Sequence, residues 1–370
     1  MLYRDSWVEV DLDALRYNVS YIKNKRKKKL IAVIKANGYG CGDAMVAKTV
    51  EEAGADMLAV SSLEEALSLR EEGIKKDILI LGYVNPALAD VLKKYDLCTT
   101  VVSKQWAEAL IKQNCSGCRV HLKADTGMNR IGIKDVSELK DTLKLLVEHQ
   151  VIVEGLFTHL ACAEEVGNEE NNLQLERFKR LQEALGYSFK WVHISNSDAA
   201  MHFDEENGNA VRCGLAMYGI SSFDHKLKPV MALKSRIVYC KKVNRGEKIG
   251  YSWSYQTKED EWIATIPIGY ADGWWRKNQG RKAYVNGEVC EFVGRICMDQ
   301  CMLKVPEGTK TGDIVELFGK NVPVTQVAIE LDTIPYEVMT ALTDRLTRVY
   351  LENDKQVKTV NSRFALFENQ

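Results

Sequence analysis

The chain has 370 residues, a length that suits one large domain together with a smaller one. Lysine and arginine number 50 and aspartate and glutamate 51, so the formal net charge is −1 and no strong positive field is present to attract nucleic acid or an anionic membrane. The sequence shows no apolar stretch of about 18 residues and no basic start before an apolar segment, so we expect neither a membrane span nor a secretory signal. These features favour a cytoplasmic protein that binds a small molecule.

The ten cysteines are scattered through apolar segments, which fits a reducing compartment better than a disulfide framework. Cys115 and Cys118 have the CxxC spacing of a metal or redox pair. The nearest second pair, Cys297 and Cys301, has a different spacing and lies far away in the sequence. We therefore predict no metal site and favour a structural role for Cys115 and Cys118.

Apolar runs of strand length alternate with amphipathic segments through the first two thirds of the chain. The eight runs cover residues 30–35, 57–62, 78–83, 98–103, 119–125, 153–159, 191–197 and 210–219. Amphipathic helices are expected between them, for example over 61–73, 136–150 and 172–186, while the polar stretch 164–172 is expected to be a surface loop. Eight nearly continuous apolar strands that alternate with helices predict an α/β fold, a closed (β/α)8 TIM-type barrel, which we assign to residues 1–225.

After about residue 225 the pattern changes to short β-rich stretches separated by turn signals. These stretches cover residues 235–243, 261–269, 282–294, 300–305 and 313–319. Within the third, the tetrapeptide VNGE is a good hairpin signal, because Asn-Gly readily adopts the positive φ angles of a two-residue turn. We assign residues 226–370 to a smaller, mostly β C-terminal domain.

Polar residues interrupt the apolar strands at the ends where a barrel of this kind carries its reactive groups. They are Lys35 after the first strand, Lys123 and Asp125 after the fifth, His159 after the sixth, His193, Asn196 and Ser197 around the seventh, and Arg212 in the eighth. Taken singly, a lysine there can simply reach solvent and a histidine can be a core residue. Arg212 is harder to explain in that way, because a buried guanidinium stays charged and needs an acceptor. Together, these residues predict a site at one rim of the barrel.

The loops after the seventh and eighth strands are the common phosphate-binding loops of such barrels. Here they offer Asn196, Ser197, Gly214 and Leu215, and the stretch SNSDAAMH resembles an N-cap followed by a short helix whose amides suit an anion. A phosphate site and a lysine in the same barrel mouth suggest pyridoxal phosphate, with Lys35 as its Schiff-base partner.

A series of motifs then extends this interpretation over nearly the whole chain. They are AVIKANGYG, LKADTGMNRIG, GLFTHLA, HISNSDAA, VRCGLAMYGI, GYSWSY, IPIGYADGWWR, VGRICMDQCM and TIPYEV. In this order and spacing the sequence resembles the bacterial alanine racemases, which are fold-type III pyridoxal-phosphate enzymes. The resemblance implies interconversion of L-alanine and D-alanine, supply of D-alanine for peptidoglycan, and a homodimer whose subunits share their active sites.

The resemblance also implies a role for individual residues. Lys35 should anchor the cofactor and act as one acid/base, and Tyr251, contributed by the other subunit, should be the second. The implied cofactor contacts are Tyr39, His159, Asn196, Ser197, Arg212, Gly214, Leu215 and Tyr336. The implied substrate contacts are Arg130, Met298 and Tyr270, and the implied supporting or channel residues are Lys123, Glu164, Arg295, Asp299 and Ile334.

Chemistry accounts for the pairing of a lysine with a tyrosine. Racemisation removes the α-proton from one face and returns a proton to the other, so it needs two groups on opposite sides. By the resemblance, Arg212 meets the pyridine nitrogen, and because arginine does not readily give up its proton the ring is a weaker electron sink that suppresses transamination. Lys123 matches a lysine that is often carbamylated in relatives and then supports Arg130. The sequence departs from many relatives at Gly38, Cys41 and Asn129, the last of which replaces a common glycine beside Arg130.

The closest alternative is a serine racemase of the glycopeptide-resistance type. Those relatives tend to replace the tyrosine at the Tyr336 position with a smaller polar residue and to carry a membrane domain before the racemase part. A decarboxylase of the same fold type would place an acidic residue where Arg212 stands, and a single-domain pyridoxal-phosphate homeostasis protein would lack the β domain with Tyr251. Alanine is therefore the favoured substrate.

Overall fold

The computed structural model describes residues 2–203 and 205–363, and they form two compact units. The barrel unit comprises Leu15–Gly38 and Asp43–Lys228. The β unit comprises the described residues of Met1–Ala14, Tyr39–Gly42 and Pro229–Gln370. The chain therefore passes between the two units several times, which a single boundary between residues 225 and 226 does not express.

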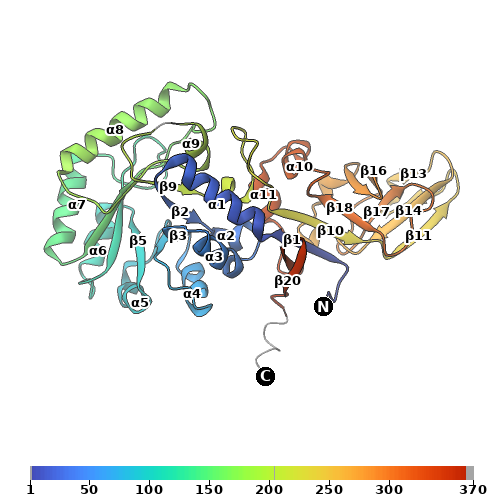
Figure 1. The fold of residues 1–370 in the computed structure, drawn as a ribbon, viewed down its shortest axis with the longest axis horizontal. Coiled ribbons are helices and arrows are strands. Elements are labelled where there is room, and N and C mark those ends of the chain that lie inside the picture. The colour runs from blue at the N-terminus through green and yellow to red at the C-terminus, as the bar shows by residue number, and fades with distance from the viewer. Residues whose placement is uncertain (1, 204, 364–370) are drawn as a thin grey trace. The chain divides into compact units, whose positions relative to one another are not determined.

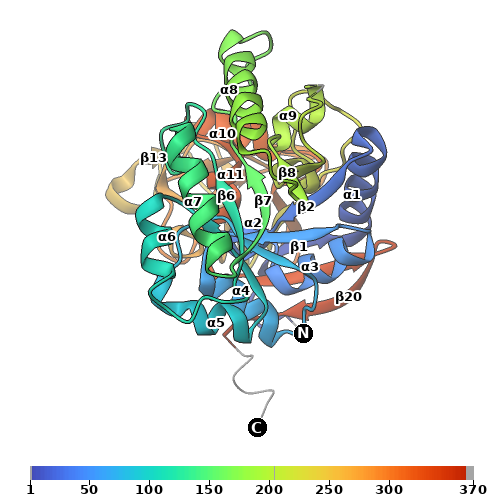
Figure 2. The same cartoon turned by 90° about the vertical axis from the view of Figure 1, so that its left-hand side faces the viewer.

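The barrel unit contains a closed barrel of eight parallel strands, as predicted (Figure 2). The strands are β2 (Lys29–Val33), β3 (Met57–Val60), β4 (Ile78–Ile80), β5 (Leu97–Val101), β6 (Arg119–Lys123), β7 (Ile152–Phe157), β8 (Trp191–His193) and β9 (Ala210–Cys213). The barrel closes where β9 pairs with β2, in a register that places Ala210 opposite Lys29. Every strand ends at least two residues before the predicted limit. Lys123, His193 and Arg212 lie on the strands themselves, and the other predicted polar residues follow the carboxyl ends of the strands.

Helices follow the strands and cover the outside of the barrel (Figure 2). They are α1 (Leu12–Arg26), α3 (Asp43–Glu52), α4 (Leu63–Glu71), α5 (Ala89–Lys94), α6 (Lys104–Leu110), α7 (Val136–Glu148), α8 (Glu169–Leu185) and α9 (Ser197–His202). Their starts follow ordinary capping chemistry: the Ser103 hydroxyl caps α6 and the Asp135 carboxylate caps α7. Since α8 begins at Glu169, the loop expected over 164–172 is wrong for its second half, where Asn168 acts as the N-cap.

The β unit is built on a ten-stranded sheet with the order β11-β14-β17-β16-β15-β18-β10-β1-β19-β20 (Figure 1). The strands are β1 (Ser6–Asp11), β10 (Met231–Arg236), β11 (Tyr239–Val243), β14 (Glu261–Ile266), β15 (Lys282–Val285), β16 (Glu288–Val293), β17 (Cys301–Val305), β18 (Ile314–Phe318), β19 (Thr347–Glu352) and β20 (Lys355–Val360). The predicted hairpin is confirmed between β15 and β16, where Asn286 has φ 50° and Gly287 has φ 92°.

The first strand of the chain belongs to this sheet. β1 pairs with β10 in antiparallel fashion and with β19 in parallel fashion, and Val8 and Val10 are fully buried. The predicted boundary of the barrel domain includes these residues, because they precede the barrel strands in the chain. A strand whose partners lie more than 200 residues away carries no local signal of the sheet that it joins.

Two short helices and a small hairpin complete the β unit. The helices are α10 (Val324–Leu331) and α11 (Pro335–Thr340), and the hairpin pairs β12 (Lys248–Ile249) with β13 (Tyr255–Gln256). The loop between these two strands carries Tyr251. Among the described residues, no helix combines the length and hydropathy that a membrane crossing requires.

Candidate active site

Lys35 stands at the start of a turn with an uncommon backbone. β2 ends at Val33, and the next turn, α2 (Lys35–Tyr39), contains Ala36, Asn37 and Gly38 with φ of 54°, 55° and 59°. Left-handed conformation costs about 1–2 kcal/mol for each residue with a Cβ atom, and such residues persist where the surrounding structure fixes them. The lysine therefore lies after the end of the buried strand, at the start of a strained turn.

A carboxylate on α4 holds this turn by accepting a hydrogen bond from its backbone. The Glu65 carboxylate accepts from the backbone N–H of Ala36 at 2.7 Å and from the backbone N–H of Ser61 at 2.7 Å. Glu65 also forms a capping box with Ser62 at the start of α4. One carboxylate therefore connects the start of α4 to the backbone that orients Lys35. Burial, followed by the positive charge of Arg130, lowers the pKa of Lys35 and favours its neutral amine.

Arg212, on β9, is buried and makes five hydrogen bonds inside the barrel unit. Its Nη1 donates to Nδ1 and to the carbonyl oxygen of His193, both at 2.9 Å. Its Nη2 donates to Nδ1 of His159 at 3.0 Å, and to the carbonyl oxygens of Thr158 at 2.8 Å and Ile194 at 2.9 Å. An arginine has four N–H bonds on its two Nη atoms and one on Nε. All five of these hydrogen bonds use the Nη atoms, and none of them uses the Nε–H.

The two histidines that face Arg212 are neutral acceptors. Burial, followed by the charge of Arg212, lowers the pKa of His159 and of His193 well below the ordinary value. Burial also lowers the pKa of Arg212 to about 9, so the guanidinium remains charged at neutral pH. The site therefore holds one fixed cation surrounded by lone pairs, which suits a ligand atom that accepts a hydrogen bond.

Ser197 is placed to donate to an anion. Its hydroxyl oxygen accepts from the backbone N–H of Gly214 at 3.0 Å and of Ala216 at 3.3 Å. Because both contacts use the oxygen, the hydroxyl hydrogen remains available to a ligand. Asn196 precedes Ser197 and caps α9 through the N–H of Ala199 at 3.0 Å. The predicted group Asn196, Ser197 and Gly214 is thus brought together, with Leu215 at the start of the following 3₁₀ turn, Leu215–Tyr218.

Lys123 and Arg130 differ in environment. Lys123 is 4% exposed. Its Nζ donates to the carbonyl of Ala124 at 3.3 Å and lies 5.0 Å from the ring centroid of Phe157. Burial, followed by the positive charge of Arg212, lowers the pKa of Lys123 well below the ordinary value. Arg130 is exposed on the loop that follows Asp125. A neutral, buried lysine amine is a reactive nucleophile, whereas Arg130 is exposed to solvent.

The loop before Arg130 is organised by a carboxylate. Asp125 Oδ1 accepts from the backbone N–H groups of Gly127 at 3.0 Å and Asn129 at 3.1 Å. Asn129 has φ 58°, a conformation that asparagine tolerates better than most residues. This residue therefore fits the position at which many relatives carry glycine, and its side chain donates to the carbonyl of Gly127 at 3.0 Å.

Tyr251 is exposed on a loop of the β unit. Its side chain is 68% exposed, and the neighbouring Trp253 is 69% exposed. Gly250, Ser252 and Trp253 have φ of 74°, 55° and 50°, so the backbone of this loop is tightly constrained. Tyr251 lies at the edge of a hollow of about 910 Å³ whose other lining residues include Tyr239, Ile263 and Met302.

Other predicted residues of the β unit lie on its loops and short helical turns. Tyr39 and Tyr336 approach each other with ring centroids 6.0 Å apart. Tyr270 begins the 3₁₀ turn Tyr270–Asp272, and Met298 and Ile334 are exposed. The remaining residues are Arg295, which is partly buried before Met298, and Glu164 of the barrel unit, which is exposed before α8.

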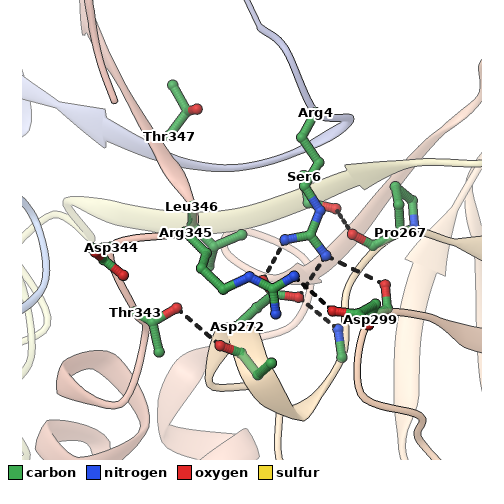
Figure 3. A network of polar contacts seen from close by, with 12 residues as sticks. Arg4, Ser6, Pro267, Asp272, Asp299, Thr343, Asp344, Arg345, Leu346 and Thr347 are labelled. Carbon is green, nitrogen blue, oxygen red and sulfur yellow. Dashed lines mark hydrogen bonds and ion pairs between the residues drawn. The ribbon is translucent and has the colours of Figure 1, made fainter. Parts of the chain in front are cut away.

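A charged network fixes the loops that carry Tyr270 and Met298 (Figure 3). Asp272 is fully buried, and its carboxylate receives two hydrogen bonds from Arg4, one of them at 2.7 Å, and an ion pair from Arg345 at 3.5 Å. The guanidinium of Arg345 also contacts Asp299 at 2.6 Å.

The backbone joins the same two loops. The N–H of Tyr270 donates to the carbonyl of Cys297 at 3.1 Å, and the N–H of Ala271 donates to the carbonyl of Met298 at 3.1 Å. A Cβ atom on Gly269 would lie 2.3 Å from the first of these carbonyl oxygens, so only glycine permits this approach. The loops of Tyr270 and Met298 therefore behave as one constrained piece of the β unit.

Sequence reasoning missed three contributors, namely Glu65, His121 and Asp272. Glu65 sits in an ordinary capping pattern, so its second contact with the Lys35 turn left no separate signal. Asp272 lies in the motif IPIGYADGWWR without a recognisable partner, because Arg4 is 268 residues away. For His121 a signal existed, since a histidine at the centre of the apolar strand RVHLK is uncommon in a barrel interior.

The barrel with a separate, mostly β unit agrees with what comparisons with known proteins show. Residues 10–222 match the family described as "Alanine racemase, N-terminal domain", and residues 230–350 match "Alanine racemase, C-terminal domain". The alanine racemase of Geobacillus stearothermophilus is 40% identical over 376 residues, which cover 97% of either chain.

Solved structures give the same answer. The crystal structure of alanine racemase from Bacillus anthracis with bound L-Ala-P has a TM-score of 0.93 at 40% identity and covers 98% of both chains. The histidine racemase from Leuconostoc mesenteroides subsp. sake has a TM-score of 0.89 at 27% identity and covers 95% of this chain and 99% of that one. These matches define an isomerase, an amino-acid racemase. The chain belongs to the alanine racemase family.

Proposed function

We propose that this chain interconverts L-alanine and D-alanine with pyridoxal 5'-phosphate as cofactor. The observation that carries the proposal is the group of side chains at the rim of the barrel unit: a buried arginine, a serine ready to donate, and a lysine of lowered pKa. The names of the similar proteins support alanine as the substrate.

The residues present fit pyridoxal phosphate. The Ser197 hydroxyl and the backbone N–H of Leu215 suit its phosphate, while the N–H of Gly214 already donates to Ser197 and holds the hydroxyl in place. The Nε–H of Arg212 suits its pyridine nitrogen, which accepts a hydrogen bond when it is unprotonated. Lys35, as a neutral amine, suits a covalent bond to its aldehyde. Tyr39, His159, Asn196 and Tyr336 are proposed to complete the pocket.

Two residues of this chain are proposed to move the proton. When bound, pyridoxal phosphate supplies a conjugated system that withdraws electrons from the α-carbon of the amino acid. Lys35 takes or returns the α-proton on one face, and Tyr251 does so on the other, so that each direction uses the two groups in opposite order. Arg212 stays protonated throughout and keeps its hydrogen bond as a donor, which disfavours full protonation of the ring nitrogen.

Tyr251 is proposed to act in the partner subunit's active site. Its side chain and that of Trp253 are exposed, on a loop whose backbone is fixed by positive φ angles. Exposed aromatic residues beside a hollow are typical of an interface. A homodimer with shared sites would cover both rings, and it would make the enzyme inactive as a monomer.

The substrate carboxylate is proposed to meet Arg130 and the backbone at Met298, with Tyr270, Arg295, Asp299, Glu164 and Ile334 around the approach. Lys123 is proposed to be carbamylated, because its amine is neutral and buried. A carbamate would give this position a negative charge within reach of Arg130 and Arg212. We further propose that the enzyme is cytoplasmic and supplies D-alanine for peptidoglycan.

The test is chiral chromatography of L-alanine and L-serine, incubated separately with the purified protein and pyridoxal phosphate. We expect D-alanine to form much faster than D-serine. Faster formation of D-serine would overturn the substrate assignment and with it the use of Tyr336 as a marker of substrate size, while formation of neither would overturn the proposed reaction.

A further inference from the structure

Two buried histidines continue the hydrogen bonding of Arg212 into the barrel interior. Nδ1 of His193 accepts from Arg212 at 2.9 Å, and Nε2 of His193 lies 2.8 Å from Nδ1 of His121. Both rings are fully buried, His193 on β8 and His121 on β6. The ring of Phe157 stacks on His193 with centroids 4.6 Å apart and planes 13° apart, so His193 is held from the side as well.

The donors decide the tautomers of both rings. Arginine can only donate, so Nδ1 of His193 must accept, and the hydrogen of this neutral ring must then lie on Nε2. That hydrogen is donated to Nδ1 of His121, which places the hydrogen of His121 on its own Nε2. Burial lowers the pKa of His121 to about 3, which agrees with two neutral rings. The lone pairs of both rings therefore point toward Arg212.

The far end of this chain is not a metal site, although it gathers metal-ligating residue types. Nε2 of His121 is buried and has no hydrogen-bond partner in the part of the chain that the structure describes, and it lies within 4.8 Å of Cys98 Sγ and a Glu154 carboxylate oxygen. A protonated Nε2 has no lone pair for a metal. Glu154 already receives two hydrogen bonds from Arg119, at 3.1 and 3.0 Å, and burial keeps the Cys98 thiol protonated by raising its pKa.

A glycine makes room for the inner histidine. Gly155 on β7 is the register partner of His121, and a Cβ atom at this position would lie 2.6 Å from both Cγ and Nδ1 of the imidazole. Its φ is not positive, so the backbone alone does not require glycine here. Glycine weakens a strand interior and often marks a place where another group approaches closely. Glycine at position 155 therefore leaves room for the ring of His121, although it weakens strand β7.

We propose that His121 and Gly155 are positioning residues: His121 fixes the orientation of His193, and through it the guanidinium of Arg212, while Gly155 admits the His121 ring. The proposal rests on the proposed function, in which Arg212 meets the ring nitrogen of pyridoxal phosphate. Two aligned imidazoles polarise each other, so the acceptor at Arg212 is stronger than a single histidine would provide. Loss of His121 leaves the Nε2–H of His193 buried without an acceptor, and His193 turns away from Arg212 to find one.

The first test needs no cofactor. In protein labelled with ¹⁵N at histidine, the Nε2–H of His193 should give a resonance that exchanges slowly with solvent in the wild type. His121→Phe should abolish its protection, whereas His149→Phe, which changes the exposed C-cap residue of α7, should leave it unchanged. A wild-type His193 that carries its hydrogen on Nδ1, or a resonance unaffected by His121→Phe, would overturn the proposal.

The second test uses the enzyme loaded with pyridoxal phosphate. His121→Phe should shift the absorbance maximum of the bound cofactor, lower kcat/KM by about tenfold, as is common for outer hydrogen-bond partners, and raise the fraction of turnovers that end in transamination. His121→Gln keeps an acceptor oxygen and should restore most of the wild-type spectrum. If His121→Phe does not fold, His121→Gln and the Gly155 series below carry the test alone.

A double-mutant cycle separates positioning from general strand packing. Gly155→Ala should displace the imidazole and reproduce the spectral shift, but in a His121→Ala background the same change should have no further effect, because no ring remains to be displaced. Equal effects of Gly155→Ala in both backgrounds would overturn the role of Gly155. A wild-type protein that takes up no pyridoxal phosphate would contradict the proposed function instead, and the resonance of His193 would still decide the orientation of the histidine pair.

Discussion

The barrel unit and the β unit present their candidate functional residues in opposite ways. In the barrel unit, Arg212, Ser197 and Lys123 are buried, and each is oriented by hydrogen bonds or ring contacts within the same unit. In the β unit, Tyr251 and Met298 are 68% and 53% exposed and stand on loops. The first set is held by its surroundings, whereas the second is held mainly by its backbone.

This difference separates two requirements of the proposed reaction. A cofactor site needs fixed donors and depressed amine pKa values, and burial supplies both. A second base that acts on the opposite face needs reach, and an exposed tyrosine on a rigid loop supplies it. The barrel unit should therefore supply most of the cofactor contacts, which Tyr39 and Tyr336 of the β unit are proposed to complete. Tyr251 should matter only when the chemistry starts.

The largest effect is expected from the barrel unit. Lys35→Ala removes the proposed anchor and one of the two bases, so racemisation and the yellow colour of the covalently bound cofactor should disappear together. Both are measured on one sample, by chiral chromatography and by absorbance. Lys29→Ala, at the exposed beginning of the strand that precedes Lys35, is the matched control and should change neither. Colour that survives in Lys35→Ala would place the anchor at another residue.

The next largest effect sharpens the comparison, because it should leave the barrel site intact. Tyr251→Phe should slow racemisation by roughly a thousandfold, near the middle of the range for loss of a general acid/base, while cofactor absorbance stays unchanged. Net rates cannot reveal the face, because the equilibrium constant between enantiomers is one. Exchange of the α-hydrogen in deuterated water should instead stop for one enantiomer and continue for the other. Tyr83→Phe, an exposed tyrosine of the barrel unit, is the control; equal slowing of exchange for both enantiomers would contradict a face-specific base.

What the sequence predicted follows the same division. The eight barrel strands were predictable because a strand buried on both faces is a continuous apolar run, and Lys35 and Arg212 were noticeable because they interrupt such runs. Residues on exposed loops interrupt nothing, so Tyr251 and Met298 entered only through the resemblance to a family. The place of β1 and the pairing of Asp272 with Arg4 depend on contacts across more than 200 residues, and no local pattern records them.

Acid should distinguish the two units in stability. All six histidines of the sequence lie in the barrel unit. His121 has a folded-state pKa of about 3 against an unfolded value near 6.5, so its contribution to stability is present above about pH 7 and is lost as pH falls through 6.5 toward 3. Between pH 7 and pH 5 this linkage amounts to about 2 kcal/mol for such a histidine.

Hydrogen exchange followed by mass spectrometry can measure the effect separately in peptides of each unit. Protection of β6 and β8 should fall between pH 7 and pH 5, after correction for the intrinsic exchange rate, and protection of β16 and β17 should not. In the His121→Phe variant, the loss of protection between pH 7 and pH 5 should be smaller, because the contribution of His121 to it is removed. An equal loss of protection in both units would show that the buried histidines do not control acid stability.

The smallest effect is expected from a change at Asp272. This change tests whether the β unit also contains loops that a buried residue holds in place. Asp272→Asn keeps the shape of the side chain but removes the charge that faces Arg4 and Arg345 (Figure 3). The turn of Tyr270 and the loop of Met298 should then shift, and a loss of about 1.4 kcal/mol in substrate binding would raise KM for alanine about tenfold, with kcat changed less than threefold.

Glu330→Gln is the matched control for this change, because it neutralises an ion pair with the buried Arg281 elsewhere in the β unit. Both variants should lower the melting temperature, but only Asp272→Asn should raise KM. If Asp272→Asn lowers the melting temperature but leaves KM unchanged, the charged network serves stability alone. Positioning by burial then belongs to the barrel unit only. If KM rises as expected, Asp272 is a buried carboxylate that holds loops of the β unit as Glu65 holds the Lys35 turn. The two units then differ in how exposed their functional side chains are, because in both of them a carboxylate fixes the loop.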